Sequence, residues 1–303
     1  MNSIAAEKNK SYKILVTGAS GFIGRAFIQT LNHNAHAVYG LDLHFPDSLK
    51  NYRLKDFYTV DLTKPFELKG SFDFVFHLAG YNVTHVGPRE ESLYLQVNVE
   101  GTKNLLKAAP IKNFIFLSTS KVYKNEGKAI DEDSKVAPEN DYEKSKLQAE
   151  IICQKYFKGS HLTILRSVNI VGPGQSAKAV IPVFFENALA GKPLNIFVPG
   201  ETHLQFVAVS DLIELFKATI EHGGLSGIFN VAPNEKIRID ELASQIIQLC
   251  GSRSKINFSN SSSVLFSEVD SKKINTALGW QTQRRLSEIL KECLPGFKGI
   301  KNE

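Results

Sequence analysis

The chain has 303 residues, of which 43% are hydrophobic, and its formal net charge is +5. This composition supports a sizeable core in one large or two modest domains and excludes a disordered chain. No apolar run approaches the roughly 20 residues of a membrane helix, and Met1–Lys10 lacks the apolar stretch of a secretory signal. We therefore expect a cytoplasmic protein with no membrane partner.

The charged residues and the cysteines exclude further classes. Lys and Arg are scattered along the chain without interleaved aromatic residues, so we expect no nucleic-acid partner, although the basic balance suits an anionic small ligand. Cys153, Cys250 and Cys293 are odd in number and far apart, which fits neither a disulfide framework nor a zinc site. We predict buried or incidental thiols and no metal.

The first part of the chain alternates short apolar runs with longer segments of helical period. The runs predict strands at Tyr12–Val16, Ala37–Leu41, Phe72–Leu78, Asn113–Leu117, Leu162–Arg166 and Gly227–Val231. The longer segments predict helices at Phe22–Leu31, Glu91–Ala109 and Tyr142–Lys158. This alternation is typical of an α/β fold in which helices cover both faces of a parallel sheet.

The texture of the chain changes after Arg166. Gly172-Pro173-Gly174, Gly191-Lys192-Pro193 and Pro199-Gly200 break it into shorter pieces, and Ser259–Ser263 is a polar loop. These breaks predict a smaller α+β lobe. Because Gly227–Val231 returns to the sheet, we expect interleaved domains: 1–166 plus about 205–231 for the sheet, and about 167–204 plus 232–303 for the second lobe.

A glycine-rich run joins the first predicted strand to the first predicted helix: Thr17-Gly18-Ala19-Ser20-Gly21-Phe22-Ile23-Gly24. In such a turn the pyrophosphate of a dinucleotide meets a helix N-terminus. Gly18 would permit the tight turn, Gly21 a close approach of backbone to phosphate, and Gly24 close packing of helix on strand. The spacing lacks the middle glycine of GxGxxG, so a purely structural turn stays open at this point.

Asp42 ends the second predicted strand, where a carboxylate can accept hydrogen bonds from the adenosine ribose. An acid at this place repels a 2′-phosphate, and neither Leu43 nor His44 is an arginine that would bind one. The pattern therefore favours NAD over NADP, with a solvated surface acid as the alternative. Asp61-Leu62 is a candidate contact on the adenine side.

Tyr142 and Lys146 are four residues apart, so on a helix they share one face. A tyrosine with a pKa of about 10 is a poor base, and lowering that pKa by roughly three units needs about 4 kcal/mol, which a nearby cation with an oxidised nicotinamide can supply. The strand ending at Leu117 delivers Ser118-Thr119-Ser120 to the ligand-binding edge of the sheet, and we favour Thr119 as the catalytic hydroxyl. A surface pair and a turn cap are the structural alternatives.

Ordered motifs along nearly the whole chain carry a family resemblance. They are TGASGFIG, Asp42, Asp61-Leu62, His77-Leu78-Ala79-Gly80, Asn98-Val99-Glu100-Gly101-Thr102, Ser118–Tyr123, Tyr142–Lys146, Leu165–Gly174, Phe206–Leu212 and Leu278-Gly279-Trp280. With them the chain resembles the extended short-chain dehydrogenase/reductases, and within these the NAD-dependent epimerase/dehydratase family that acts on nucleotide sugars.

The resemblance implies a doubly wound Rossmann domain that binds NAD, a lobe for the sugar nucleotide, and catalysis by Thr119, Tyr142 and Lys146. The implied cofactor-binding residues are Gly18, Ser20, Gly21, Phe22, Ile23, Gly24, Asp42, Asp61, Leu62, Leu78, Ala79, Gly80, Asn98, Lys146 and Val168. The implied substrate-binding residues are Ser120, Tyr142, Asn169, Lys178 and Lys192. Resembling proteins pair as homodimers through the helices predicted at Glu91–Ala109 and Tyr142–Lys158.

The chain also departs from the family pattern. Ser120 and Lys121 stand where family dehydratases have Asp and Glu, which disfavours water elimination. Leu204 replaces an arginine that grips the diphosphate, and Ser261–Ser263 occupies the region of a second one. The remaining candidates for this grip are Lys178, Lys192 and Arg253. Glu143 and Lys124 replace glycines of the YG and VYG motifs, which adds charge near the cleft.

These observations predict an NAD-dependent epimerase or 4-ketoreductase that acts on a nucleotide-diphosphate sugar, as in the biosynthesis of deoxysugars and surface polysaccharides. Hydride transfer at a sugar carbon would be assisted by Tyr142. One alternative is a ketoreductase or dehydrogenase on a non-nucleotide hydroxyl compound, which Leu204 makes credible. Another is a non-catalytic relative that only binds the cofactor.

Overall fold

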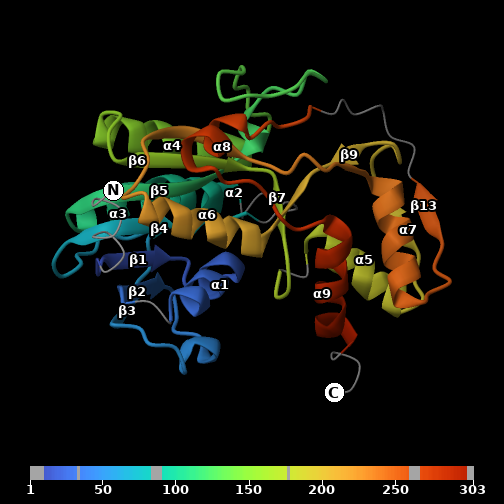
Figure 1. The fold of residues 1–303 in the computed structure, drawn as a ribbon, viewed down its shortest axis with the longest axis horizontal. Helices are drawn as coiled ribbons and strands as arrows, with labels where there is room; N and C mark the ends of the chain where they lie inside the picture. The colour runs from blue at the N-terminus through green and yellow to red at the C-terminus, as the bar shows by residue number, and fades with distance from the viewer. Residues whose placement is uncertain (1–9, 33–34, 83–90, 176–177, 259–266, 299–303) are drawn as a thin grey trace, which may run out of the picture.

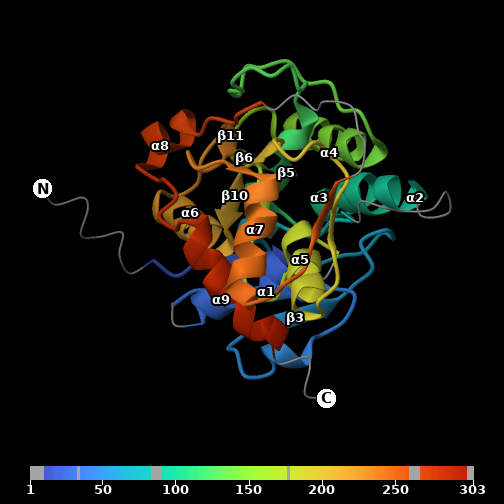
Figure 2. The ribbon, with the colours of Figure 1, turned by 90° about the vertical axis from the view of Figure 1, so that its right-hand side faces the viewer.

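The computed structural model describes residues 10–32, 35–82, 91–175, 178–258 and 267–298. A large sheet domain lies on one side and a smaller helical lobe on the other (Figure 1). Turned by 90°, the smaller lobe faces the viewer in front of the sheet domain (Figure 2). Within the described ranges, every helix is too short or too polar to cross a membrane.

A seven-stranded sheet, parallel at every pairing, forms the centre of the large domain, in the order β11-β6-β5-β4-β1-β2-β3. Its strands are β1 (Lys13–Thr17), β2 (Ala37–Asp42), β3 (Asp56–Thr59), β4 (Phe72–His77), β5 (Ile111–Thr119), β6 (Leu162–Ser167) and β11 (Gly227–Val231). The strand order reverses at β1, which places a ligand-binding crevice at the carboxyl edge between β1 and β4. The predicted Rossmann-type α/β fold is confirmed.

Helices cover both faces of the sheet. On one face α1 (Phe22–Leu31) and α6 (Val209–Glu221) bury residues such as Phe27 and Phe216 against the strands. On the other face α3 (Gly101–Ala108) and α4 (Asp141–Phe157) bury Leu105 and Cys153. The short helix α8 (Lys272–Leu278) and Trp280 also pack into the first of these cores.

The helix predicted at Glu91–Ala109 is divided into three parts. It begins as α2 (Glu91–Leu93), continues as the π-helical segment η2 (Tyr94–Glu100), and ends as α3. The wider π turn contains Asn98, whose buried side chain contacts Ser145 on α4. Asn98 and Ser145 are 47 positions apart, so the hydrophobic periodicity of the sequence could not predict this contact.

The smaller lobe has a core of its own, formed by α5 (Val180–Leu189), α7 (Ile239–Cys250) and α9 (Leu286–Lys298). Three short strand pairs accompany these helices: β7 (Asn169–Val171) with β10 (Phe206–Ala208), β8 (Leu194–Ile196) with β13 (Ile256–Phe258), and β9 (His203–Leu204) with β12 (Ile237–Arg238). Two 3₁₀ turns, η1 (Asp47–Leu49) and η3 (Ser120–Val122), complete the elements of the described residues. The polar loop expected at Ser259–Ser263 lies outside the described residues.

Candidate active site

The glycine turn after β1 accepts no larger residue at two of its positions. Gly18 has a φ of +67°, and a Cβ added there would lie 2.7 Å from the backbone nitrogen of Ala79. A Cβ added at Gly24 would overlap the carbonyl oxygen of Gly18. Gly21 is the N-cap of α1, and its backbone nitrogen donates a hydrogen bond to Gly18 O at 3.0 Å. The turn therefore has backbone atoms and no side chains at Gly18 and Gly21, at the N-terminus of α1. This is the form of a pyrophosphate cradle.

Asp42, at the end of β2, forms a hydrogen bond with this turn. Its Oδ2 accepts a hydrogen bond from the backbone nitrogen of Ser20 at 2.9 Å, and its Oδ1 accepts one from that of Leu43 at 2.7 Å. The carboxylate is thereby fixed at the crevice edge, where an adenosine ribose would lie. The turn and the acid that sequence reasoning selected are brought together.

The end of β4 links the turn to the helix that carries the predicted catalytic pair. Ala79 N donates to Thr17 Oγ1 at 3.3 Å. A Cβ added at Gly80 would lie 3.2 Å from Asn98 Oδ1 and 3.9 Å from Lys146 Nζ. Gly80 therefore stands between the glycine turn and α4, as a residue lining the crevice should.

The remaining predicted cofactor residues take different places. Asp61 accepts hydrogen bonds from Thr63, which lower the pKa of its carboxyl. The side chain of Leu62 is buried in the core between the sheet and α3, so only its backbone can face a ligand. The side chains of three further residues pack against the core on the α1 face: Phe22, Ile23 and Leu78. Val168 packs there too, and its backbone nitrogen donates a hydrogen bond to Val231 O at 3.1 Å.

The three predicted catalytic residues converge at the carboxyl edge of β5. Thr119 ends that strand, and its hydroxyl is close enough to the Tyr142 phenol, in the first turn of α4, to lower the pKa of that phenol. Lys146, one turn further along α4, donates from Nζ to the carbonyl oxygen of Leu117 at 2.6 Å. Its ammonium also lies 4.3 Å from the centre of the Phe116 ring.

Burial shifts the pKa values of two members of this trio. Burial raises the pKa of Tyr142 to about 12, an effect that the Thr119 hydroxyl partly offsets and that the charge of Glu143 increases. Burial lowers the pKa of Lys146 to about 8. The ammonium of Lys146 is directed at Leu117 O rather than at the phenol, and a lowered phenol pKa beside an oxidised nicotinamide stays a prediction. At neutral pH the phenol holds its proton and Lys146 is mostly charged.

A buried ion pair lies beneath Lys146. Arg166 on β6 donates to both carboxylate oxygens of Glu150, with its terminal nitrogen 2.6 Å from Oε2, and Ser118 Oγ donates to Oε1. Glu150 follows Lys146 by four residues on the same face of α4, and its charge raises the pKa of Lys146 against the effect of burial. The guanidinium also covers the Tyr123 ring at 4.7 Å.

The predicted substrate residues are more dispersed. Ser120 begins η3 beside Thr119, and Asn169 begins β7 with its amide 3.4 Å from Gln205 O. Lys178 precedes α5 whereas Lys192 follows it, so a helix of ten residues, about 15 Å long, separates the two cations. Which of the two cations holds a diphosphate stays a prediction.

Three residues near Tyr142 are not among the predicted site residues. Asn140 and Glu143 form a capping box at the start of α4, and the Asn-x-x-Glu spacing before a helix would have revealed it. Ser145 donates to Tyr142 O at 2.7 Å and accepts from Asn98 at 2.9 Å. That bridge depends on a contact across 47 positions and has no local signal.

The fold and this set of side chains define a class: an enzyme of the extended short-chain dehydrogenase/reductase type with a Rossmann domain for NAD. The model of the NAD dependent epimerase/dehydratase family matches residues 14–232. The chain belongs to that family, whose members use NAD.

Individual relatives cover most of the chain. It is 31% identical to a UDP-N-acetyl-alpha-D-glucosaminuronate decarboxylase of Bacillus cytotoxicus, over 80% of the chain and 82% of the relative. It is 28% identical to human dTDP-D-glucose 4,6-dehydratase, over 94% and 90%. A crystal structure of UDP-glucuronic acid 4-epimerase from Bacillus cereus, in complex with UDP-glucuronic acid and NAD, superposes with a TM-score of 0.85 at 28% identity, covering 95% of this chain and 99% of that one.

Proposed function

We propose that the chain is an NAD-dependent epimerase or 4-ketoreductase acting on a nucleoside-diphosphate sugar. One observation carries the proposal: Thr119, Tyr142 and Lys146 converge at the sheet edge, next to a glycine turn of the form that binds a pyrophosphate at a helix N-terminus. The names of the relatives, which include an epimerase, a dehydratase and a decarboxylase of nucleotide sugars, support this substrate class.

The residues around the crevice fit NAD. A Cβ at Gly18 or Gly24 would meet the protein's own backbone, so these positions need glycine to form the turn, and Asp42 offers a carboxylate for ribose hydroxyls. Gly80 keeps the approach to the Lys146 ammonium open, so that this cation can also hold a ribose hydroxyl. Bound NAD supplies or accepts the hydride at the sugar carbon.

Tyr142 handles the proton that accompanies this transfer. Its phenol, protonated at neutral pH and next to the Thr119 hydroxyl, is prepared to donate a proton to the oxygen of a keto sugar. In the opposite direction the phenolate takes the proton from a sugar hydroxyl, which requires the Lys146 ammonium to turn from Leu117 O toward the phenol, where its charge stabilises the phenolate. Thr119 and Ser120 orient the sugar oxygen. Ser120 and Lys121 supply no carboxylate for water elimination, so we do not propose dehydration.

The first experiment identifies small molecules released on denaturation of the fresh protein by mass spectrometry. Near-stoichiometric NAD supports an epimerase that recycles its cofactor, and its absence with binding of added NADH supports a reductase. Wild type and Tyr142→Phe are then incubated with UDP-glucose, UDP-glucuronic acid and their 4-keto forms. Turnover by wild type and loss of at least a hundredfold in the variant is expected. No binding of NAD or NADH would refute the proposal.

A non-nucleotide hydroxyl compound is the second candidate substrate. Leu204 lies where resembling enzymes have a phosphate-gripping arginine, and Lys178 and Lys192 stand at opposite ends of α5. Thermal shift decides between the two, because a bound nucleoside diphosphate raises the melting temperature through linkage. No shift with UDP at millimolar concentration favours the second candidate.

We also propose that α4 and the η2–α3 helix form a homodimer interface. Leu95 on η2 and both Ile151 and Tyr156 on α4 are large apolar side chains that are more than 40% exposed. Their exposure on neighbouring helices supports a surface that a second copy covers. A monomer mass by light scattering would contradict it.

The proposed division into interleaved domains, with boundaries near 166, 205 and 231, can be tested by limited proteolysis.

A further inference from the structure

Tyr142 lies in the first turn of α4, where the helix backbone is least well held. It is the second residue of α4, after the N-cap Asn140. The first backbone N–H groups of a helix have no partner within the helix, so the first turn tends to fray unless side chains cap it. A phenol that must transfer a proton needs its backbone held in one place. The question is which side chain provides that restraint.

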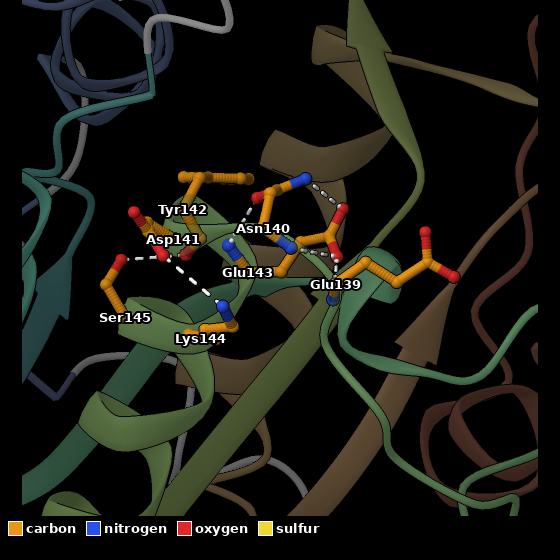
Figure 3. Close-up of polar contacts among 7 residues, drawn as sticks. All are labelled: Glu139, Asn140, Asp141, Tyr142, Glu143, Lys144 and Ser145. Atoms are coloured by element: carbon orange, nitrogen blue, oxygen red, sulfur yellow. Dashed lines mark hydrogen bonds and ion pairs between the residues drawn. The ribbon is translucent and has the colours of Figure 1, made fainter. Parts of the chain in front are cut away.

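Glu143 makes an unusually complete cap. Its Oε2 accepts hydrogen bonds from the backbone nitrogens of Glu139 at 2.8 Å and Asn140 at 3.5 Å, and its Oε1 accepts one from Asn140 Nδ2 at 2.7 Å. Asn140 Oδ1 in turn accepts from Glu143 N at 3.0 Å. Figure 3 shows the two side chains facing each other, with the Glu139 carboxylate directed away. Glu143 is 8% exposed, so water competes little for these bonds.

We propose that Glu143 is a positioning residue that fixes the first turn of α4 and thereby holds the Tyr142 phenol against the Thr119 hydroxyl. The inference rests on the proposed role of Tyr142 in proton transfer. It assigns a function to the carboxylate that replaces the family's glycine at this position. The restraint from Ser145, which donates to Tyr142 O at 2.7 Å, acts on the opposite side of the same residue.

The carboxylate also contributes charge at the phenol. The groups that act on Tyr142 are the Thr119 hydroxyl from β5, the Tyr94 phenol from η2, and Glu143 from α4 itself, while the Lys146 ammonium points to Leu117 O. Glu143 and Tyr94 raise the pKa of Tyr142, whereas Thr119 lowers it. Removing the charge of Glu143 should therefore move the inflection that Tyr142 gives to the kcat–pH profile to lower pH, whichever direction the proton takes.

The test compares Glu143→Ala, Glu143→Gln and the control Glu139→Ala. The first removes the cap and its charge, and the second removes the charge but keeps one carbonyl acceptor. The control removes an equal charge from the same loop, where only the backbone nitrogen of Glu139 contacts the cap. Two readouts are used: hydrogen exchange of the peptide spanning residues 139–146 in the protein without substrate, and the kcat–pH profile on the nucleotide sugar that wild type converts.

We expect exchange in this peptide to be about fivefold faster in Glu143→Ala, which corresponds to the usual loss of a cap, and unchanged in Glu139→Ala. We expect kcat to fall at least threefold at constant KM in Glu143→Ala. In Glu143→Gln the loss should be smaller, with the inflection at lower pH. Wild-type exchange in Glu143→Ala, or an unmoved profile in both variants, would overturn the proposal. If wild type converts no sugar tested, the proposed function fails, and the exchange comparison still decides the role of Glu143.

Discussion

Acid should destabilise the sheet domain through one histidine. His77 ends β4, is 1% exposed, and lies with its Nδ1 2.7 Å from Thr17 Oγ1 and its Nε2 2.9 Å from Thr102 Oγ1. The hydroxyl hydrogen of Thr102 is already donated to Asn98 O at 2.6 Å, so Thr102 must accept from His77. The proton of the neutral ring is therefore on Nε2, and Nδ1 accepts from Thr17. Protonating Nδ1 would place a buried charge where a hydrogen bond is accepted.

The size of the effect follows from the shifted pKa. Burial lowers the pKa of His77 from 6.5 to about 3, with the Lys146 charge acting in the same direction. Between these values the unfolded chain binds a proton that the folded chain does not, so stability falls as the pH falls below 6.5. At pH 5 the difference is about 1.5 pKa units, or about 2 kcal/mol.

Urea denaturation of wild type and His77→Gln at pH 7.5 and pH 5 isolates this contribution. The fluorescence of Trp280, the only tryptophan, reports on the core between the sheet and α6. The variant is less stable at both pH values, but the advantage of wild type over it should shrink by about 2 kcal/mol at pH 5. An advantage that is the same at both pH values would show that His77 takes up its proton in the folded protein, and would refute the reasoning.

Three other changes test the buried ion pair, the glycine turn and the charge of Lys146. Glu150→Ala should cost about 3–5 kcal/mol by leaving Arg166 buried without its partner, and a calorimetric melt in which the variant loses under 1 kcal/mol would contradict this. Gly24→Ala pushes a Cβ into Gly18 O, so calorimetric titration should show NAD binding at least tenfold weaker; unchanged affinity would exclude the proposed cradle. Because the pKa of Lys146 is about 8 in the fold against 10.5 in the unfolded chain, this group makes stability rise from pH 8 to 9.5, and Lys146→Met should abolish that rise in urea melts.

The sheet was readable because buried parallel strands are nearly continuous apolar runs. Gly227–Val231 and Phe22–Leu31 were predicted with the bounds they have in β11 and α1, and the other predicted strands differ by a few residues at their ends. The strand β3 was missed. It lies at the sheet edge, where Asp56 and Thr59 are exposed, so its sequence lacks the apolar run of its neighbours.

The placement of the proposed catalytic trio was also predictable, but the pKa of its phenol was not. Spacing alone places Tyr142 and Lys146 on one face of α4, and the strand pattern places Thr119 at the sheet edge. The direction of the Tyr142 pKa depends instead on burial and on where Lys146 Nζ points, and both are tertiary facts. The Leu117 carbonyl that receives this ammonium is a backbone atom, and side-chain motifs carry no information about it.

The proposed diphosphate-binding residues show more clearly what the sequence cannot reveal. The sequence contains several cations that could replace the arginine absent at Leu204. To bind a diphosphate, however, a cation must lie near the crevice between β1 and β4 and must not already be paired with a carboxylate. Antiparallel pairing of β9 with β12 sets Arg238 opposite His203, next to Leu204, which no spacing in the sequence reveals. Its guanidinium is held by both carboxylate oxygens of Asp240, at 3.1 and 2.6 Å. An anionic substrate that bound Arg238 would therefore have to compete with Asp240. Strand register and pairing with carboxylates, rather than the number of basic residues, determine which cation can bind a diphosphate.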